Sequence, residues 1–342
     1  MAAEFGPMRR LALALSAAGL LLTAPVVTPA AAQDFYAGKT VTIVVGFPPG
    51  GGVDAGARLL QRHLGKFIPG NPSIVIQNMP GASGLVAANH LYARAERDGL
   101  MLGLPGRDWV MYSALQLSAA KFDSLKFNFI GSTGAVNNYG WVRADLGIRS
   151  LAQLKTHASK VVIGALSPAT VTASVPNMLI AGGYPLQVVT GYRGTVQIVQ
   201  AIEQNEVHGI FTNLATFARR SDLIDKTVIR LFQVFPEVKN LPLVEDLVPK
   251  ETRPLMRAVN APTTTGMPFI APPEVPAERV AILRKAFLAM ARDQAFMADA
   301  DKIGEPTGAP IAGEKLLAVY TGLIAGTTPE VAKGFRELTA LK

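Results

Sequence analysis

The 342-residue chain contains no cysteine and only four histidines. Without cysteine it has no disulfide, no thiolate nucleophile, no cysteine-based metal site and no lipid anchor on an N-terminal cysteine. The histidines do not follow H-E-x-x-H or a similar metal-binding spacing, so we expect no metal and no cofactor. They are His63, His90, His157 and His208. Paired carboxylates for acid–base chemistry are also missing from the glycine-containing loops, so we expect a protein that is not an enzyme.

Long apolar runs are absent beyond the N-terminus. Arg9 and Arg10 precede a short leucine- and alanine-rich stretch that ends in Ala30-Ala31-Ala32, the pattern of a secretory signal peptide. Pro25 and Pro29 break this stretch, which is too short to span a bilayer. We therefore predict that residues 1–32 are a signal peptide with an upstream extension, and that the mature protein lies in the periplasm.

Acidic residues are in the minority. The chain has 33 lysines and arginines against 25 aspartates and glutamates, a formal net charge of +8. A basic surface favours anionic ligands or anionic membrane surfaces. The basic residues are scattered and form no block interleaved with aromatics, so we expect no nucleic-acid partner.

Strand-like and helical segments alternate along the first half of the chain. We predict strands at 41–45, 74–76 and 101–104, and helices from Asp54 to Gly65 and over 85–95. Asp54 is the expected N-cap of the first helix and Gly65 its stop. This order predicts an α/β fold with a parallel sheet.

A second series of the same kind begins after Tyr139. Its predicted strands are 161–163, 187–189 and 209–211, and its predicted helices 151–155, 173–181 and 196–206. A proline-rich segment, 236–276, is predicted to be mostly loop, with a strand at 267–270 and C-terminal helices behind it. We therefore predict two α/β lobes with a ligand cleft between them: residues 33–136 with 264–342, and residues 137–263.

The most informative loop leaves the first strand through glycines and enters a helix. Its candidate ligand-binding residues are Phe47, Pro49, Gly50, Gly51, Gly52 and Asp54. Glycines let a ligand approach the backbone, and the free N–H groups at a helix start attract anions. A P-loop is excluded because Val53-Asp54 stands where Lys-Ser/Thr is needed, and a dinucleotide fingerprint because Gln77-Asn78 follows the second strand instead of an acid. A plain glycine turn that packs helix on strand is the alternative.

Three further loops carry candidate binding residues. Gly81, Ala82, Ser83 and Gly84 follow the second strand and precede a helix, which predicts a second helix start at the same sheet edge. Ser83 has no G-x-S-x-G context and no evident base, so a nucleophile is not favoured. Ser167 and Thr170 suit either a carboxylate or a helix cap. Tyr192, Arg193 and Gly194 follow a strand of the second half, where Arg193 faces either an anion or solvent.

These motifs together resemble the Bug family, the periplasmic solute-binding proteins of tripartite tricarboxylate transporters. The resemblance rests on motifs in consistent order over nearly all of the mature chain: residues 44–60, 77–84, Asp98-Gly99, 191–194, Leu241-Pro242 with Glu245, and 271–278. The chain departs from the family at Gln77, Met79 and Ser83, where the family usually has glutamate, a basic residue and glycine.

The resemblance implies a type II periplasmic binding fold that closes over a small carboxylate, such as a di- or tricarboxylate or an aromatic carboxylate. The first two loops would grip one carboxylate, and Ser167, Thr170 and residues 192–194 would line the opposite lobe. The implied partners are separately encoded membrane permease subunits, and the protein itself is expected to be a monomer. A sensor component for a membrane receptor is the main alternative; an exported hydrolase would require a nucleophile and base that the sequence does not present.

Arg107-Asp108-Trp109 is more charged and aromatic than the resemblance leads us to expect. Our hypothesis is that Arg107 or Trp109 tunes ligand choice towards a second carboxylate or an aromatic ring. The alternative is a structural salt bridge beside a half-buried tryptophan.

Overall fold

The computed structural model describes residues 35–305 and 309–339. The predicted signal peptide therefore lies outside the described residues. In the described part of the chain, no helix is long and apolar enough to cross a membrane.

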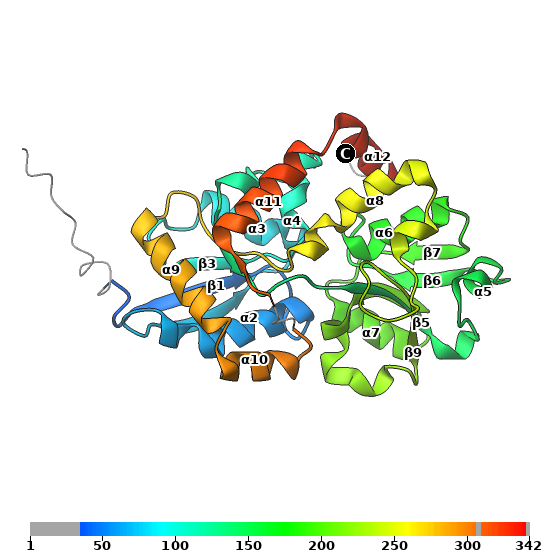
Figure 1. The fold of residues 1–342 in the computed structure, drawn as a ribbon, viewed down its shortest axis with the longest axis horizontal. Coiled ribbons are helices and arrows are strands. Elements are labelled where there is room, and N and C mark those ends of the chain that lie inside the picture. Colours follow the sequence, from blue (N-terminus) through cyan, green and yellow to red (C-terminus); the bar gives the residue numbers. More distant parts are fainter. Residues whose placement is uncertain (1–34, 306–308, 340–342) are drawn as a thin grey trace, which may run out of the picture.

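The described chain forms two mixed β-sheets, each covered by helices (Figure 1). The first sheet has the order β11-β4-β10-β3-β1-β2, with strands β1 (Thr40–Val45), β2 (Ser73–Asn78), β3 (Met101–Leu104), β4 (Asn128–Ser132), β10 (Phe269–Ala271) and β11 (Ile311–Ala312). The second has the order β7-β6-β8-β5-β9, with strands β5 (Asn138–Arg143), β6 (Val161–Gly164), β7 (Leu186–Val189), β8 (Gly209–Asn213) and β9 (Val228–Gln233). The predicted α/β class and the six strands of its two repeated series are confirmed.

The predicted parallel pairing holds for three strands in each sheet, and the remaining pairings are antiparallel. Strands β1, β2 and β3 are parallel, as are β6, β7 and β8, but β10 runs antiparallel to β3, and β5 antiparallel to β8. Strands β10 and β5 are each the first to enter their sheet after the chain has crossed from the other one. Such a strand arrives without a right-handed helical crossover, which is the connection that makes neighbouring strands parallel.

The helices cover the sheets and connect their strands. The α-helices are α2 (Gly52–His63), α3 (Leu85–Ala93), α4 (Trp109–Ala114), α5 (Leu151–Lys155), α6 (Val171–Ala181), α7 (Thr195–Glu203), α8 (Arg253–Asn260), α9 (Ala277–Met290), α10 (Gln294–Asp301), α11 (Gly313–Ala325) and α12 (Pro329–Thr339). Helix α8 lies in the segment predicted to be loop. Its proline stands at the start of the helix, where the missing N–H costs no hydrogen bond.

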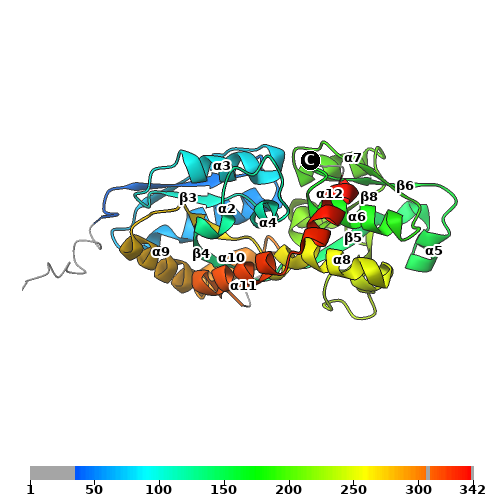
Figure 2. The ribbon, with the colours of Figure 1, turned by 90° about the horizontal axis from the view of Figure 1, so that it is seen from above.

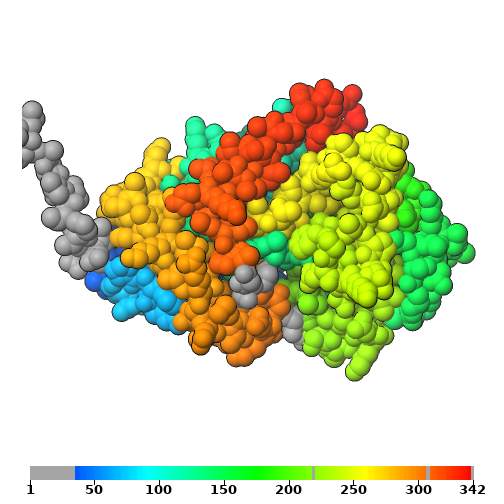
Figure 3. Space-filling model, viewed as in Figure 1, coloured from blue at the N-terminus to red at the C-terminus, as the bar shows by residue number. Residues whose placement is uncertain are grey.

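The chain passes between the two halves three times. Residues 133–137 lead from β4 to β5, the segment after β9 leads back to β10, and α12 crosses again after α11 (Figure 2). Helix α11 packs on β4, whereas α12 packs on α6 and α8. The C-terminal segment lies over the junction of the two halves (Figure 3). The lobe boundaries at 136/137 and 263/264 stay a prediction, and α12 lies against the half that the prediction gives to residues 137–263.

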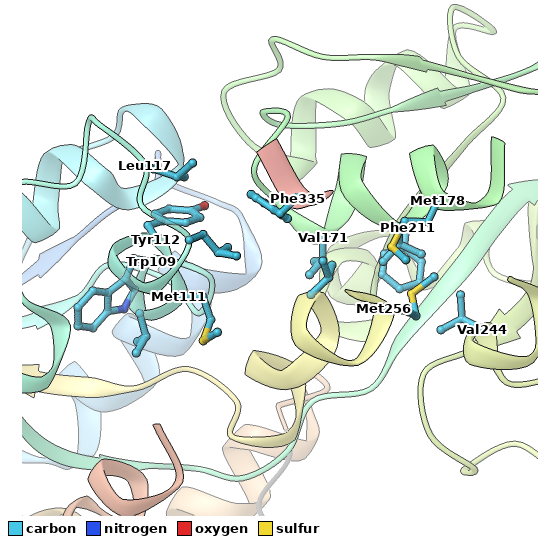
Figure 4. Packing of buried hydrophobic residues seen from close by; sticks show 14 of the residues in the cluster. Trp109, Met111, Tyr112, Leu117, Val171, Met178, Phe211, Val244, Met256 and Phe335 are labelled. Carbon is cyan, nitrogen blue, oxygen red and sulfur yellow. The ribbon is translucent and has the colours of Figure 1, made fainter. Parts of the chain in front are cut away.

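A single hydrophobic cluster extends through both halves. Met111 and Tyr112 of α4 lie on the side that faces α6 and α12, where Val171 and Phe335 lie (Figure 4). Trp109 is fully buried in this cluster, with its ring centroid 5.0 Å from that of Phe127 and 5.6 Å from that of Phe122. It is a core residue rather than the half-buried or ligand-facing tryptophan that the sequence suggested. The cluster connects the halves behind the cavities described next.

Candidate functional site

The carboxyl ends of the parallel strands of both sheets face one another, and their loops enclose two neighbouring cavities. The loops after β1, β2 and β3 come from the first sheet, and those after β6, β7 and β8 from the second. The cavities share Phe47, Pro48 and Leu166. Ligands of open α/β sheets bind at this edge, so the cavities are the candidate site.

The first cavity, the Arg107 cavity, has a volume of about 70 Å³. It is bounded by the starts of α2 and α7, so two sets of free helix N–H groups lie at its wall. Five predicted binding residues line it: Phe47, Gly51, Gly52, Arg107 and Gly194. The prediction missed several polar residues in its wall, among them Asp108, Asn138, Thr172, Thr195, Thr212 and Asn213.

The second cavity, the Ser83 cavity, has a volume of about 390 Å³. Six further predicted residues line it: Gly81, Ala82, Ser83, Ser167, Tyr192 and Arg193. Arg193 is exposed to solvent. The predicted set is thus divided between two cavities on either side of Phe47, Pro48 and Leu166.

The two sides of the site touch each other. The Ser83 hydroxyl donates to the Ser167 Oγ at 2.8 Å, which joins the loop after β2 to the loop after β6. A Cβ on Gly194 would lie 3.0 Å from the Pro48 Cγ, so the α7 start also approaches the first loop closely. Both contacts require the halves to be close together, and the structure is therefore a closed arrangement.

Asp54 lies behind the first loop rather than in a cavity. It is fully buried, and its carboxylate accepts hydrogen bonds from the Gly50 N–H, the Arg58 guanidinium and the Asn78 amide at 2.8–2.9 Å. Burial pushes the pKa of Asp54 up, but these three hydrogen bonds together bring it below its usual value. Asp54 is not the N-cap, which is Gly51; it lies in the first helical turn and holds the loop from behind.

Four other predicted residues also support the loops without lining either cavity: Pro49, Gly50, Gly84 and Thr170. Gly84 has a φ of +94°, and a Cβ there would lie 2.0 Å from the Pro105 carbonyl oxygen. The loops after β2 and β3 therefore pack backbone against backbone, which only glycine permits. The buried Thr170 hydroxyl donates to the Ser167 carbonyl oxygen at 2.7 Å and so shapes the loop before α6.

Arg107 brings a positive charge to its cavity without an ion-pair partner among residues 35–305 and 309–339. Its one hydrogen bond to a described side chain is a long contact of 3.5 Å to the Asn138 Oδ1. Burial lowers the pKa of Arg107, an effect opposed by Asp108, Glu305 and Tyr320, yet a guanidinium keeps its charge at any physiological pH. The predicted alternative of a structural salt bridge at Arg107 is therefore wrong for the described residues.

Asp108 and Asn138 each have one side-chain atom without a hydrogen-bond partner among the described residues. Burial raises the pKa of Asp108 to about 6, against the opposing effects of Arg107 and of a hydrogen bond from the Val171 N–H. The other carboxylate oxygen, Oδ1, is buried and has no partner in the described part of the chain, and the same holds for the Asn138 Nδ2. Buried polar atoms without partners are rare, and several around one cavity indicate a place for a ligand.

A buried glutamate lies behind Arg107. Glu305 is 5% exposed, and its Oε1 accepts a hydrogen bond from the Thr133 hydroxyl at 3.0 Å. Burial raises the pKa of Glu305 to about 7, although Thr133 and Arg107 both favour its charged form. At neutral pH this carboxyl is close to the midpoint of its titration.

We expect the stability of the protein to fall between pH 6 and pH 7 because of Glu305. The folded protein keeps this proton up to about pH 7, whereas the unfolded chain releases it near pH 4.5. The folded state holds the extra proton in that window, so the free energy of unfolding decreases as pH rises through it and levels off above pH 7. Asp108 contributes the same sign but only up to about pH 6.

Urea unfolding of Glu305→Gln at pH 6.0, 6.5 and 7.0 measures this effect. The wild-type decrease should disappear in Glu305→Gln and persist in the control Glu251→Gln, which replaces an exposed glutamate. An equal decrease in wild type and Glu305→Gln would contradict the assignment.

Known proteins resemble this chain in sequence and in fold. The BugT protein of Bordetella pertussis (strain Tohama I / ATCC BAA-589 / NCTC 13251) is 37% identical over 82 residues, which are 24% of each chain. A UPF0065 protein in the TAR-I ttuE-ttuC' intergenic region of Agrobacterium vitis is 31% identical over 150 residues, 42% of each chain. The chain thus matches less than half the length of these relatives. No protein-family model matches it.

The solved structure of the periplasmic binding protein BugD superimposes with a TM-score of 0.70 at 19% identity, over 89% of this chain and 99% of BugD. The chain is therefore similar to Bug proteins in sequence over part of its length and in fold over most of it. MatC from Rhodopseudomonas palustris, solved with bound malate, gives a TM-score of 0.68 at 20% identity, over 86% of this chain and 99% of MatC. At such identities the likeness shows the fold: this chain has the two-lobed α/β fold of periplasmic binding proteins.

Proposed function

We propose that this protein is a periplasmic solute-binding protein that captures a small carboxylate between its two halves and delivers it to a tripartite tricarboxylate-type transporter. The carrying observation is the Arg107 cavity: a guanidinium without an ion-pair partner among the described residues faces a space bounded by two helix starts. Guanidinium groups and helix N-termini both stabilise carboxylates.

The composition of the Arg107 cavity further supports a carboxylate with an organic body. Besides its polar groups, the wall contains Phe47, Val53, Leu166, Val171 and Phe211. Apolar walls with a few fixed polar groups are typical of small-molecule sites. MatC, whose fold this chain shares, holds malate, a small dicarboxylate.

The delivery step rests on the arrangement of the two halves and on the predicted signal peptide. Loops from both sheets bound the cavity, so separation of the halves would widen its entrance and couple ligand exchange to domain movement. Permease subunits in the membrane that recognise the closed form would then receive the ligand from a monomeric, freely diffusing carrier. In this role the protein binds and releases its ligand unchanged.

Native mass spectrometry of the purified protein, followed by thermal unfolding with mono-, di- and tricarboxylates, tests the proposal. A carboxylate that binds the folded state raises the melting temperature in a concentration-dependent way. We expect at least one small carboxylate to do so and to be recovered unchanged after incubation. No shift with any carboxylate, or turnover of one, would contradict the proposed function.

A further inference from the structure

The Arg107 cavity contains two charged side chains of opposite sign. In the described part of its wall, Arg107 is the one cation and Asp108 the one anion. Although they are neighbours in the chain, they form no ion pair with each other, and neither forms one with another described residue. Neither charge is therefore compensated by an ion pair with a described residue.

Asp108 lies where both halves meet. It precedes α4 of the first half, and it accepts a hydrogen bond from the N–H of Val171, the first residue of α6 in the second half. That contact occupies part of the carboxylate, while Oδ1 stays buried and has no partner among residues 35–305 and 309–339. A buried acceptor without a donor is costly, so a ligand donor placed against Oδ1 gains affinity by removing that cost.

Asn138 extends the same pattern. It is 2% exposed, its Oδ1 faces Arg107 at 3.5 Å, and its Nδ2 has no partner. The cavity therefore offers donors from Arg107 and Asn138 next to an acceptor from Asp108. Donors and acceptor together match a ligand that presents an acceptor group and a donor group within a short distance.

The charges determine which donor fits best. A plain carboxylate at Arg107 would place its negative charge close to that of Asp108, and like charges in a poorly solvated cavity repel strongly. A ligand that brings a positive charge with its carboxylate leaves both protein charges paired. We propose that the ligand is an amino acid, with its carboxylate at Arg107 and its ammonium group at Asp108; this proposal rests on the proposed carboxylate-binding function.

The test compares ligands that share one skeleton and differ only at C2. Each of three triplets contains an unsubstituted acid, its hydroxy acid and its amino acid. The triplets are propanoate, lactate and alanine; succinate, malate and aspartate; and 3-phenylpropanoate, phenyllactate and phenylalanine. In at least one triplet we expect the amino compound to bind wild type at least about 10-fold more tightly than the unsubstituted acid, the size of a charge-assisted hydrogen bond. The hydroxy compound should lie between them.

The matched variant is Asp108→Asn, which keeps the shape and an acceptor but removes the charge. We expect it to reduce the preference for the amino compound to about 3-fold or less. Tyr112→Phe is the control, because Tyr112 lies one helical turn away and its hydroxyl is also buried without a partner. This control should keep the wild-type preference.

Calorimetry of the wild-type protein gives an independent readout that needs no variant. At pH 7, in two buffers of different ionisation enthalpy, an unsubstituted acid should take up a proton on binding, because its negative charge favours protonation of Asp108. The amino compound should take up fewer protons, because its ammonium group favours the charged form of Asp108.

The outcomes separate this inference from the proposed function. If carboxylates bind but no triplet favours its amino compound, or if Asp108→Asn keeps the wild-type preference, the amino-acid assignment is overturned and the carboxylate site remains. If no member of any triplet binds, the proposed carboxylate-binding function itself is contradicted.

Discussion

Replacement of Arg107 by alanine should weaken carboxylate binding by about 100-fold, within a range of roughly 30- to several thousand-fold. Removing one partner of a buried charge pair costs about 2–5 kcal/mol of binding free energy, since the remaining charge stays buried without compensation. Here the loss is reinforced by Asp108 and Glu305, two carboxyl groups that interact with Arg107 and would then face the ligand without it. Isothermal titration of both proteins with the best carboxylate of the panel measures the change.

Two further variants show whether the effect depends on the position and shape of the charge. Arg107→Lys keeps the charge but loses the planar fork of donors, and should retain part of the affinity. Arg193→Ala removes an exposed arginine from the Ser83 cavity, and its smaller effect should decrease further with added salt. Binding by Arg107→Ala within about 3-fold of wild type would show that Arg107 does not hold the carboxylate.

The glycine-containing loops were predictable because their chemistry is local. A glycine segment between a β-branched strand and a helix places free N–H groups at a sheet edge, whatever the rest of the chain does. Gly51, Gly52, Gly81 and Gly194 accordingly line the cavities where the sequence predicted them. Asp54 stands in the same segment, but the hydrogen bonds to Gly50, Arg58 and Asn78 that hold it behind the loop are invisible in a linear pattern.

Asn138 shows what the sequence could not indicate. It is the first residue of β5, which follows the segment that crosses from the first sheet, and it reaches the Arg107 cavity only because β5 enters the second sheet beside β8. Glu305 comes from the distant end of the chain and reaches the same charge network through tertiary packing. The position of Asp108 next to Arg107 could have marked it as a candidate binding residue. Adjacent opposite charges instead indicate an ion pair, and the structure does not form one.

The role of Trp109 was harder to predict from the sequence, because tryptophan occurs both in ligand pockets and in hydrophobic cores. An exposed indole beside an arginine would have indicated an aromatic ligand. The structure places it at 0% exposure among Phe122, Phe127 and Phe129, the last stacked at 16° with centroids 6.4 Å apart. In the sequence, the three phenylalanines that follow Trp109 within 20 positions are the pattern that indicates a local aromatic core.

Replacement of Trp109 by alanine should reduce the free energy of unfolding by about 3–5 kcal/mol, as expected for a large side chain removed from a packed core. The loss should be large because the cavity left behind is bounded by rigid rings that cannot collapse into it. Urea unfolding followed by far-ultraviolet circular dichroism measures the change. We expect both halves to be destabilised, because the cluster around Trp109 includes Val171 of α6 and Phe335 of α12.

Trp109→Phe is the matched control. The indole N–H is buried without a partner, so phenylalanine removes an uncompensated polar group while keeping an aromatic ring in the cluster. Its destabilisation should therefore be about 1–2 kcal/mol, clearly smaller than that of alanine. The ligand preference of folded Trp109→Phe should match wild type, because Trp109 lines neither cavity. A changed ligand preference with unchanged stability would contradict this assignment. It would show that Trp109 contributes to ligand specificity together with Arg107.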